Sequence, residues 1–227
     1  MSEQIVITSI ARTPMGGFQG ALSDASATQL GAAAVGAAVT RSGLQGDAID
    51  ELLMGCVLPA GLGQAPARQA ALGAGLPLSV GCTTINKMCG SGMKAMMLTH
   101  DLIAAGSANI VVAGGMESMT NAPYLAMGAR SGFRFGDVQL LDAIQRDGLW
   151  CAFDACLMGL GTERYAAGEI SRDAQDDLAM KSNQRAAAAI AAGRLADEIV
   201  PISIPQRKGD PIVISNDEGV RASTTME

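Results

Sequence analysis

The chain has 227 residues and a formal net charge of −6; 48% of its residues are hydrophobic and only 3% are aromatic. This length suits one large domain, or one domain with a sizeable insertion. The charges form no long run of one sign, which argues against a nucleic-acid surface. No run of about 18 apolar residues is free of polar breaks, which argues against a membrane span.

Cysteine and histidine usage narrows the class further. Five cysteines, an odd number without C-x-x-C spacing, do not suit a disulfide framework. A single histidine is too few for most metal sites, so no metal is expected. Acidic Glu3 precedes the apolar Ile5-Val6-Ile7, and no basic segment stands before it. These features predict a cytoplasmic protein.

The first 115 residues alternate between short apolar or β-branched runs and helical patterns. The runs typical of strands cover 5–10, 52–57, 80–86 and 110–113. Helical patterns cover 28–40, then a segment from Pro66 to about Gly73, and one from Cys89 to about Gly106. Proline suits the first turn of a helix and glycine commonly ends one. The alternation predicts an α/β layered domain with a largely parallel sheet.

The sequence changes character after Gly115. Residues 121–137 hold Pro123 and several glycines, which indicates an irregular excursion. Ser171 is a good N-cap for a helix running to about 192. Strands are expected at 199–204 and 212–214, joined by a turn at 207–210. We therefore expect residues from about 120 onward to form a second unit inserted into the first.

Cys89 stands in the run Asn86-Lys87-Met88-Cys89-Gly90-Ser91-Gly92, where a predicted strand turns sharply into a helix. Unpaired N–H groups and the positive end of the helix dipole favour the thiolate of a cysteine at a helix start. The thiolate is the nucleophilic form, so the position predicts covalent catalysis. The alternative is a buried structural cysteine, the common fate of a free thiol.

The helix that follows Cys89 is almost wholly apolar, and we expect it to be buried nearly all round. His100 lies eleven positions beyond Cys89 on this helix, which separates them by roughly 16 Å at about 1.5 Å per residue. That distance is far beyond hydrogen-bond reach, so His100 cannot be the base for Cys89. Lys87 and Lys94 could lower the pKa of the thiol, but solvated or ion-paired lysines explain them equally well. The sequence therefore identifies no base for the nucleophile.

Several segments together resemble the thiolase family. The run 86–95 resembles its acyl-enzyme motif, 63–69 (GQAPARQ) resembles the helix start after its second strand, and 114–119 (GGMESM) resembles the glycine turn after its fourth. Segments 197–201 and 207–210 are similar to its loop domain, which covers coenzyme A. The resemblance implies a layered α/β/α domain at 1–119 with a mixed, mostly parallel sheet. It also implies an inserted α+β loop domain at 120–227.

The resemblance implies a function as well. Thiolases form or cleave 3-oxoacyl-CoA by Claisen condensation or thiolysis, and Cys89 would carry the acyl group as an enzyme-bound thioester. Coenzyme A thioesters would be the substrates, with no metal or redox cofactor, and the setting would be fatty acid metabolism. Leu149 and Met158 match apolar positions along the pantetheine and acyl path, and Arg221 matches an arginine near the adenine. Residues 121–137 resemble the loop that joins dimers, which implies a homo-oligomer, either a dimer or a tetramer.

Two departures from the family pattern matter. Leu157 stands where short-chain biosynthetic thiolases have a histidine, which removes a polar contact to coenzyme A and leaves short or medium acyl chains open. The family's Gly-His-Pro and Cys-x-Gly-Gly-Gly motifs, which hold the activating histidine and the second cysteine, do not occur. We therefore expect the N-terminal part of a longer enzyme, without the C-terminal thiolase domain and with little activity alone.

Two alternatives to a thiolase remain open at this point. One is a non-catalytic CoA-binding or assembly module, a half-thiolase kept for its interfaces. The other is a condensing enzyme of the same superfamily that uses a carrier-bound malonyl group, which the inserted loop domain and the Cys-Gly-Ser-Gly run argue against.

Overall fold

A parallel three-stranded sheet lies at the centre of the computed structural model, which describes residues 4–226. Its strands are β1 (Glu51–Gly55), β2 (Gly81–Ile85) and β3 (Val111–Gly115), in the order β2-β1-β3. Glu51 lies opposite Gly81 on one side and Val111 on the other, so all three strands end at the same edge. Ligands of parallel α/β sheets commonly bind at this carboxyl edge.

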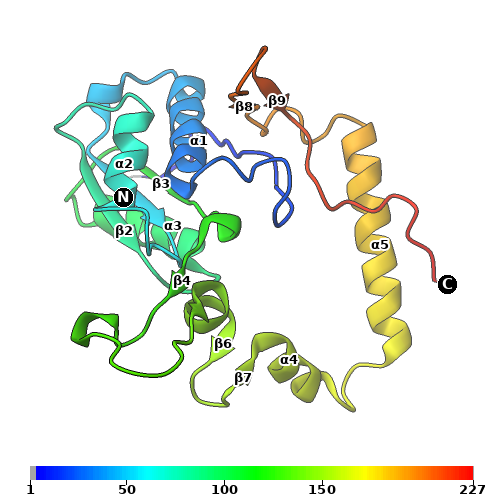
Figure 1. The fold of residues 1–227 in the computed structure, drawn as a ribbon. Coiled ribbons are helices and arrows are strands. Elements are labelled where there is room, and N and C mark those ends of the chain that lie inside the picture. The colour runs from blue at the N-terminus through cyan, green and yellow to red at the C-terminus, as the bar shows by residue number, and fades with distance from the viewer. Residues whose placement is uncertain (1–3, 227) are drawn as a thin grey trace.

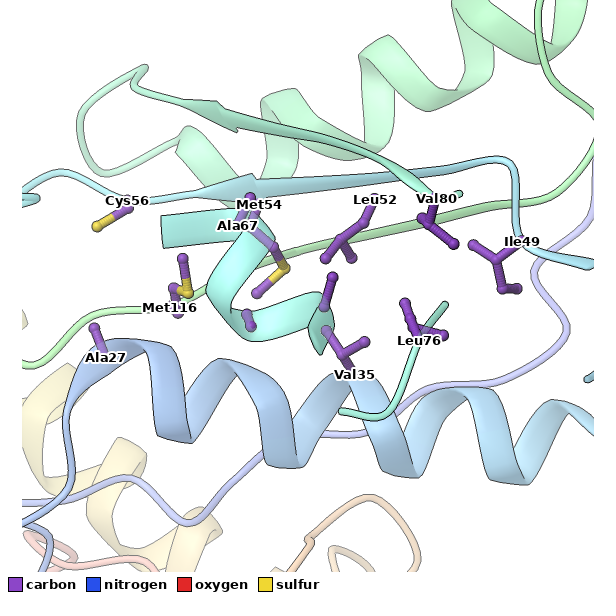
Figure 2. Close-up of a cluster of buried hydrophobic side chains, with 12 residues drawn as sticks. Ala27, Val35, Ile49, Leu52, Met54, Cys56, Ala67, Leu76, Val80 and Met116 are labelled. Carbon is purple, nitrogen blue, oxygen red and sulfur yellow. The ribbon is translucent and has the colours of Figure 1, made fainter. Parts of the chain in front are cut away.

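Helices cover both faces of this sheet. The helices α1 (Ala27–Ser42) and α2 (Pro66–Gly73) lie on one face, and α3 (Ser91–Ala104) lies on the other (Figures 1 and 2). Parallel strands joined by crossover helices require this layered arrangement. The predicted layered α/β fold with a parallel sheet is therefore confirmed.

Local signals fix the ends of α1 and α2. The Ser26 hydroxyl accepts a hydrogen bond from the Gln29 N–H, and the Gln29 side chain accepts one from the Ser26 N–H. This capping box satisfies amides that a helix start leaves unpaired. Gly43 ends α1 with a φ of 73°, a left-handed conformation that glycine adopts at little cost. Pro66 occupies the first turn of α2, where its missing N–H is not needed.

The main core fills the space between the sheet and the helices α1 and α2, as Figure 2 shows. Leu52 of β1 has no exposed surface, and Met54 lies beside it with 2%. Burying one such side chain contributes about 1.5–3 kcal/mol. Small residues let α2 approach the sheet closely, since Ala67, Ala70 and Ala71 are all fully buried. The core thus replaces missing aromatics with methionine, leucine and alanine.

The strand predicted at 5–10 is wrong. The structure has irregular backbone there, and Val6, Ile7 and Ile10 are largely exposed. The segment is held instead through α1, because the Ser9 hydroxyl donates to the Ala38 carbonyl and Arg41 donates to the Ile10 carbonyl. An alternating apolar pattern becomes a strand only where a neighbouring strand supplies hydrogen bonds. No described strand does so here.

The chain after β3 forms short elements followed by one long helix. In chain order these include the paired strands β4 and β5, β6 and β7, and β8 and β9, each pair antiparallel. Their bounds are Tyr124–Leu125, Leu141–Asp142, Trp150–Cys151, Cys156–Leu157, Ile202–Ile204 and Ile212–Ile214. The helices are α4 (Met158–Ala166), α5 (Arg172–Ala191) and a six-residue π-helix at Ile144–Leu149, with short 3₁₀ turns at Met119–Asn121 and Ala129–Ser131; a further 3₁₀ turn, Gly46–Ala48, lies earlier, between α1 and β1. None of the helices within 4–226 is both long and apolar enough to cross a membrane.

The β8–β9 hairpin packs against the start of α1 and forms a second small core. Leu22 and Ala25 meet Ile202 and Ile204 there. The predicted boundary at 119/120 stays a prediction, but residues on its two sides share this cluster.

An ion-pair network reinforces the same junction. Arg12 donates to both oxygens of Asp217, at 2.7 and 2.9 Å, and to Glu198 at 2.7 Å. These hydrogen bonds raise the pKa of Arg12 and lower the pKa of Asp217. Both partners are therefore charged at neutral pH, and the network ties the N-terminal segment to the end of the chain.

Candidate active site

Cys89 is exposed in the turn between β2 and α3, at the carboxyl edge of the sheet. Helix α3 begins at Ser91 with Gly90 as its N-cap, so Cys89 comes one residue before the cap. No side chain caps this helix start. Uncapped first-turn amides and the helix dipole create a positive local field, which favours an anion beside them. The helix start that the sequence predicts at Cys89 is thus observed two residues later, at Ser91.

Hydrogen bonds among four residues shape the turn that presents Cys89. These residues, called here the elbow clamp, are Asn86, Lys87, Met88 and Ser91. Met88 has a φ of +50°, which is unfavourable for a residue with a side chain. The Asn86 Oδ1 accepts from the Met88 N–H at 2.9 Å, and the Ser91 hydroxyl donates to the Met88 carbonyl at 2.6 Å. The strained residue is therefore held on both its backbone groups.

Ser91 closes the clamp from inside the protein. Its hydroxyl also accepts from the Lys87 N–H at 2.9 Å, so it both donates and accepts. Ser91 is only 5% exposed, although its neighbour Cys89 is exposed. A buried hydroxyl that makes two hydrogen bonds avoids a desolvation cost of about 1–3 kcal/mol. Ser91 thus anchors the turn while Cys89 faces outward.

Glycines at the strand ends let the start of α3 approach the sheet. A Cβ atom on Gly55 would lie 2.6 Å from the carbonyl carbon and the Cβ of Ser91. A Cβ on Gly115 would lie 3.4 Å from the Gly92 Cα. Real Cβ atoms do not come as close to other heavy atoms as the 2.6 Å that a Cβ on Gly55 would require. Gly55 is therefore required for the contact that seats Ser91.

Glu117 holds the loop that follows β1. Its carboxylate accepts from the Val57 N–H at 2.7 Å and from the Leu58 N–H at 3.2 Å. The Val57 carbonyl in turn accepts from the Asn86 Nδ2 at 3.3 Å, which links this loop to the elbow clamp. Glu117 lies also beside the buried Cys56, and burial together with this carboxylate raises the pKa of the Cys56 thiol to about 12. Cys56 therefore stays a neutral thiol, unlike a catalytic nucleophile.

The expectation that α3 is buried nearly all round is wrong. Only Ser91 and Ala95 are buried, whereas Met93 is 71% exposed, Met96 50% and Met97 54%. The helix contacts the sheet along one side, through β1 and β3. An apolar sequence shows that burial is possible, but a covering element is needed to achieve it, and no described element lies over this face.

No base is found beside Cys89 among the described residues. His100 is exposed and lies 3.5 Å from the Asp101 carboxylate, near the far end of α3. Its place on α3 agrees with the sequence argument that it cannot reach Cys89. No group of three or more His, Cys, Asp or Glu side chains within 4–226 is arranged to hold a metal ion.

The residues predicted to contact coenzyme A fall into two places. Leu157 lies opposite Trp150 in the β6–β7 hairpin, so Leu149 and Met158 adjoin the same pair. Arg221 lies elsewhere, beside α5, where its N–H donates to the Asn183 Oδ1 at 2.9 Å. No described contact joins either place to Cys89. These four assignments therefore remain predictions.

Sequence reasoning gave no role to Asn86, Ser91, Glu117 or Gly55. Asn86 carried a usable signal, because an asparagine often accepts a hydrogen bond from the backbone two residues later. Ser91 acts on residues three and four positions before it, whereas Glu117 and Gly55 contact segments that are distant in sequence. Their roles become visible only once the register of the sheet is known.

Comparison with known proteins gives a consistent result. Residues 5–227 match the family model described as "Thiolase, N-terminal domain". The chain is 49% identical over 224 residues to an acetyl-CoA acetyltransferase of Cupriavidus necator, a match that covers 98% of this chain and 57% of the relative. It is 47% identical over 226 residues to one of Pseudomonas aeruginosa, covering 99% and 58%. It is also 48% identical over 218 residues to acetyl-CoA acetyltransferase 2 of Arabidopsis thaliana, covering 95% and 54%.

The chain thus spans somewhat more than half the length of these relatives. The family model covers nearly every residue, including the elbow clamp, the loop after β1 and the β8–β9 hairpin. By its sequence and by its layered fold, this chain belongs to the thiolase family and corresponds to the family's N-terminal domain.

Proposed function

We propose that the protein to which this chain belongs is a CoA-dependent acyltransferase that forms or cleaves 3-oxoacyl-CoA. One observation carries the proposal: Cys89 is exposed beside an uncapped helix start, on a turn held by the elbow clamp. A fixed, accessible thiol in a positive local field is suited to attack a thioester carbonyl. Relatives named acetyl-CoA acetyltransferase support an acyl-CoA as the substrate.

The reaction would proceed in two halves. In the first, the Cys89 sulfur attacks the thioester carbonyl of an acyl-CoA, and the coenzyme leaves as a thiol after taking a proton. The acyl group is then bound to Cys89 as a new thioester. In the second half, the α-carbanion of acetyl-CoA attacks that thioester, which releases 3-oxoacyl-CoA and the Cys89 thiolate. Thiolysis is the same sequence in reverse.

The backbone N–H of Cys89, beside the start of α3, would help to stabilise the negative oxygen that forms during each attack, since the N–H groups of Gly90 and Ser91 already donate within the turn. Such donors are worth most where they are fixed before the reaction begins. The elbow clamp fixes this turn, and Gly90 and Gly92 keep side chains away from it. We propose that the base that removes the α-proton belongs to the part of the longer protein that corresponds to the rest of its relatives.

The remaining assignments are part of the same proposal. Leu149, Leu157 and Met158 would line the pantetheine and acyl path, and Arg221 would lie near the adenine. Leu157 offers no polar group, which argues against a special preference for acetoacetyl-CoA, whereas Met158 would narrow the acyl pocket and so favours short or medium acyl chains. The exposed apolar side chains of the 121–137 loop, such as Phe133 and Phe135, support a role in homo-oligomer contacts. A cytoplasmic location, a role in fatty acid metabolism and the lack of a resident cofactor complete the proposal.

Mass spectrometry after incubation with acetyl-CoA tests the first half-reaction. We expect one acetyl group on the peptide that contains Cys89, which hydroxylamine removes because it is a thioester, and none on the same peptide in the Cys89→Ser variant. Cys82→Ser is a matched control, because Cys82 is a free thiol within β2, only seven positions earlier in the sequence. An adduct on any other cysteine, or none on the full-length protein, would contradict the proposal.

A second candidate is a CoA-binding module without catalysis. It is favoured by the position of His100, which is exposed and turned to Asp101 rather than to Cys89. This candidate predicts that calorimetry detects CoA binding to the full-length protein while intact-mass measurement finds no acetylation.

A further inference from the structure

Two free cysteines face each other across the β6–β7 hairpin. Cys151 and Cys156 are paired partners in the strand register, adjacent to the pair Trp150 and Leu157. Directly opposed residues of an antiparallel pair point to the same face, with Cβ atoms about 4.5–5.5 Å apart. A disulfide needs Cβ atoms about 3.5–4.5 Å apart and Cα atoms about 4.4–6.8 Å apart. A small approach of the two strands would therefore bring the sulfurs into bonding distance.

No other pair of cysteines in the described chain shares this arrangement. Cys82 lies in β2 opposite Leu52, and Cys56 is buried against Glu117 at the end of β1. Cys89 lies in the exposed turn before α3. Among the described strands, only the β6–β7 register places one cysteine directly opposite another.

The surroundings of the two thiols differ in a way that assigns each a role. Cys151 is partly exposed and lies against Asp154, whose N–H donates to its sulfur at 3.4 Å. Cys156 is 5% exposed and its sulfur accepts from the Arg164 guanidinium at 3.8 Å. This contact positions the Cys156 sulfur within the hairpin. Cys151 is thus the sulfur that a reagent in solution reaches, and Cys156 is the sulfur placed to react with it next.

We propose that Cys151 and Cys156 form an oxidation site that a small-molecule disulfide, such as oxidised glutathione, converts into an intrachain disulfide. The Cys151 thiolate attacks one sulfur of the reagent, breaks its S–S bond and releases one thiolate. The Cys156 thiolate then attacks the Cys151 sulfur of the mixed disulfide and releases the second. The two cysteines lose two electrons and two protons, which convert the reagent into two thiols. Thiol–disulfide exchange proceeds by these steps.

The new bond would be readily reversible. It closes a loop of only six residues, and short loops gain the least stability from a cross-link. Disulfides with little stabilisation have higher reduction potentials and are the labile ones. Reduced glutathione should therefore reopen it. The consequence for CoA rests on the proposed function: Leu157 and Met158 adjoin the cross-link, so a stiffened hairpin would alter their mobility.

Peptide mapping after glutathione titration tests the site independently of any acyltransferase activity. The protein is equilibrated with mixtures of oxidised and reduced glutathione, free thiols are blocked with N-ethylmaleimide, and the chain is cut with trypsin. The peptide 147–164 contains both cysteines and has no internal Lys or Arg. We expect this peptide to lose both maleimide labels and two hydrogens, at a lower oxidant ratio than changes any other cysteine.

Variants separate this outcome from general thiol reactivity. In Cys156→Ser, Cys151 should accumulate glutathione as a mixed disulfide, because the second step is lost. In Arg164→Gln, trypsin no longer cuts after residue 164, so both cysteines are read in the longer peptide 147–172, and closure of the disulfide should be slower. Cys82→Ser is the control and should leave the titration unchanged. The proposal is overturned if 147–164 keeps both labels while Cys82 or Cys89 is oxidised, or if the native chain stops at the mixed disulfide.

Discussion

The substitution Gly55→Ala tests whether the close approach of β1 and α3 positions Cys89. The added Cβ would lie 2.6 Å from two carbon atoms of Ser91. Carbon atoms prefer separations of about 3.5–4.0 Å, so the start of α3 would have to move by about 1 Å. Forcing an extra methyl group into a packed region costs about 1–3 kcal/mol. Ser91 is the anchor of the elbow clamp, so the shift would also loosen the turn before α3.

Two measurements follow from this reasoning. Urea unfolding should give a free energy of unfolding lower by about 1–3 kcal/mol. Alkylation of Cys89 by iodoacetamide at a fixed pH, followed by peptide mass spectrometry, should proceed at a changed rate. A purely global loss of stability would not change that rate below the unfolding transition, because Cys89 is exposed already in the native chain.

Gly36→Ala is the matched control. Gly36 lies inside α1, and a Cβ there would meet the Ala74 carbonyl oxygen at 3.6 Å, an ordinary contact. Alanine in place of a glycine inside a helix is expected to stabilise by about 0.5–1 kcal/mol. The two variants should therefore differ in sign. If Gly55→Ala has the same stability and the same Cys89 alkylation profile as the native chain, the role given to this contact is refuted.

Three further predictions concern other parts of the fold. Asp217→Asn should lower the free energy of unfolding near pH 7 by about 1.5–3 kcal/mol. Because its hydrogen bonds to Arg12 lower the pKa of Asp217, the native chain should lose this contribution as the pH falls below the ordinary aspartate range. Equal pH profiles of the two chains in urea unfolding would contradict this prediction. The pKa of Cys56 is raised from 9.0 to about 12, so the native chain should lose stability as the pH rises through this interval. The free energy of unfolding should fall by at most about 1.4 kcal/mol per pH unit. Cys56→Ala should remove this pH dependence in the same assay. Ser26→Ala should lower the free energy of unfolding by about 1 kcal/mol, because the capping box is lost. The urea midpoint should fall while the dependence of the unfolding free energy on urea stays the same. An unchanged midpoint would refute the role of the cap.

The elements that sequence reasoning placed well are those with strong local signals. The helix expected at 28–40 is observed at Ala27–Ser42, and the one expected to begin at Pro66 and end near Gly73 does so. The long helix after Ser171 is observed at Arg172–Ala191. Serine caps, an N-terminal proline and a C-terminal glycine act within one turn of the chain, so their effect can be read without knowing the fold.

Elements with weak local signals, and one segment that depends on a distant contact, were missed or misassigned. The pattern at 5–10 is that of a strand, but no described strand lies beside it. Helix α4 was not predicted, because Gly159 and Gly161 lower its intrinsic helix propensity by about 1 kcal/mol each. The β6–β7 hairpin, which sets Cys151 opposite Cys156, is too short to leave a pattern. Only for 5–10 is the deciding contact distant in sequence, whereas α4 and the hairpin were missed because their local signals are weak.

The same distinction applies to the candidate site. Cys89 was found from sequence because a cysteine between a strand and a helix carries its own chemical signal. Glu117 and Gly55 carry none alone, since each acts on a segment about 30 to 60 residues away, and only the register of β1 and β3 reveals the contact. The position of Cys89 can thus be predicted locally, whereas the contacts of Glu117 and Gly55 cannot.

The exposed side of α3 bears on how Cys89 would be activated. Met93, Met96 and Met97 project from the helix that begins beside the nucleophile, and no element in 4–226 covers them. Thiolate attack on a thioester gains from a site that excludes water, because the fixed N–H groups then act more strongly on the developing charge. A segment that covered these methionines would exclude water from Cys89 and could carry the base that His100 cannot supply. The relatives are longer than this chain by enough to hold such a segment, which supports the proposal that activation comes from there.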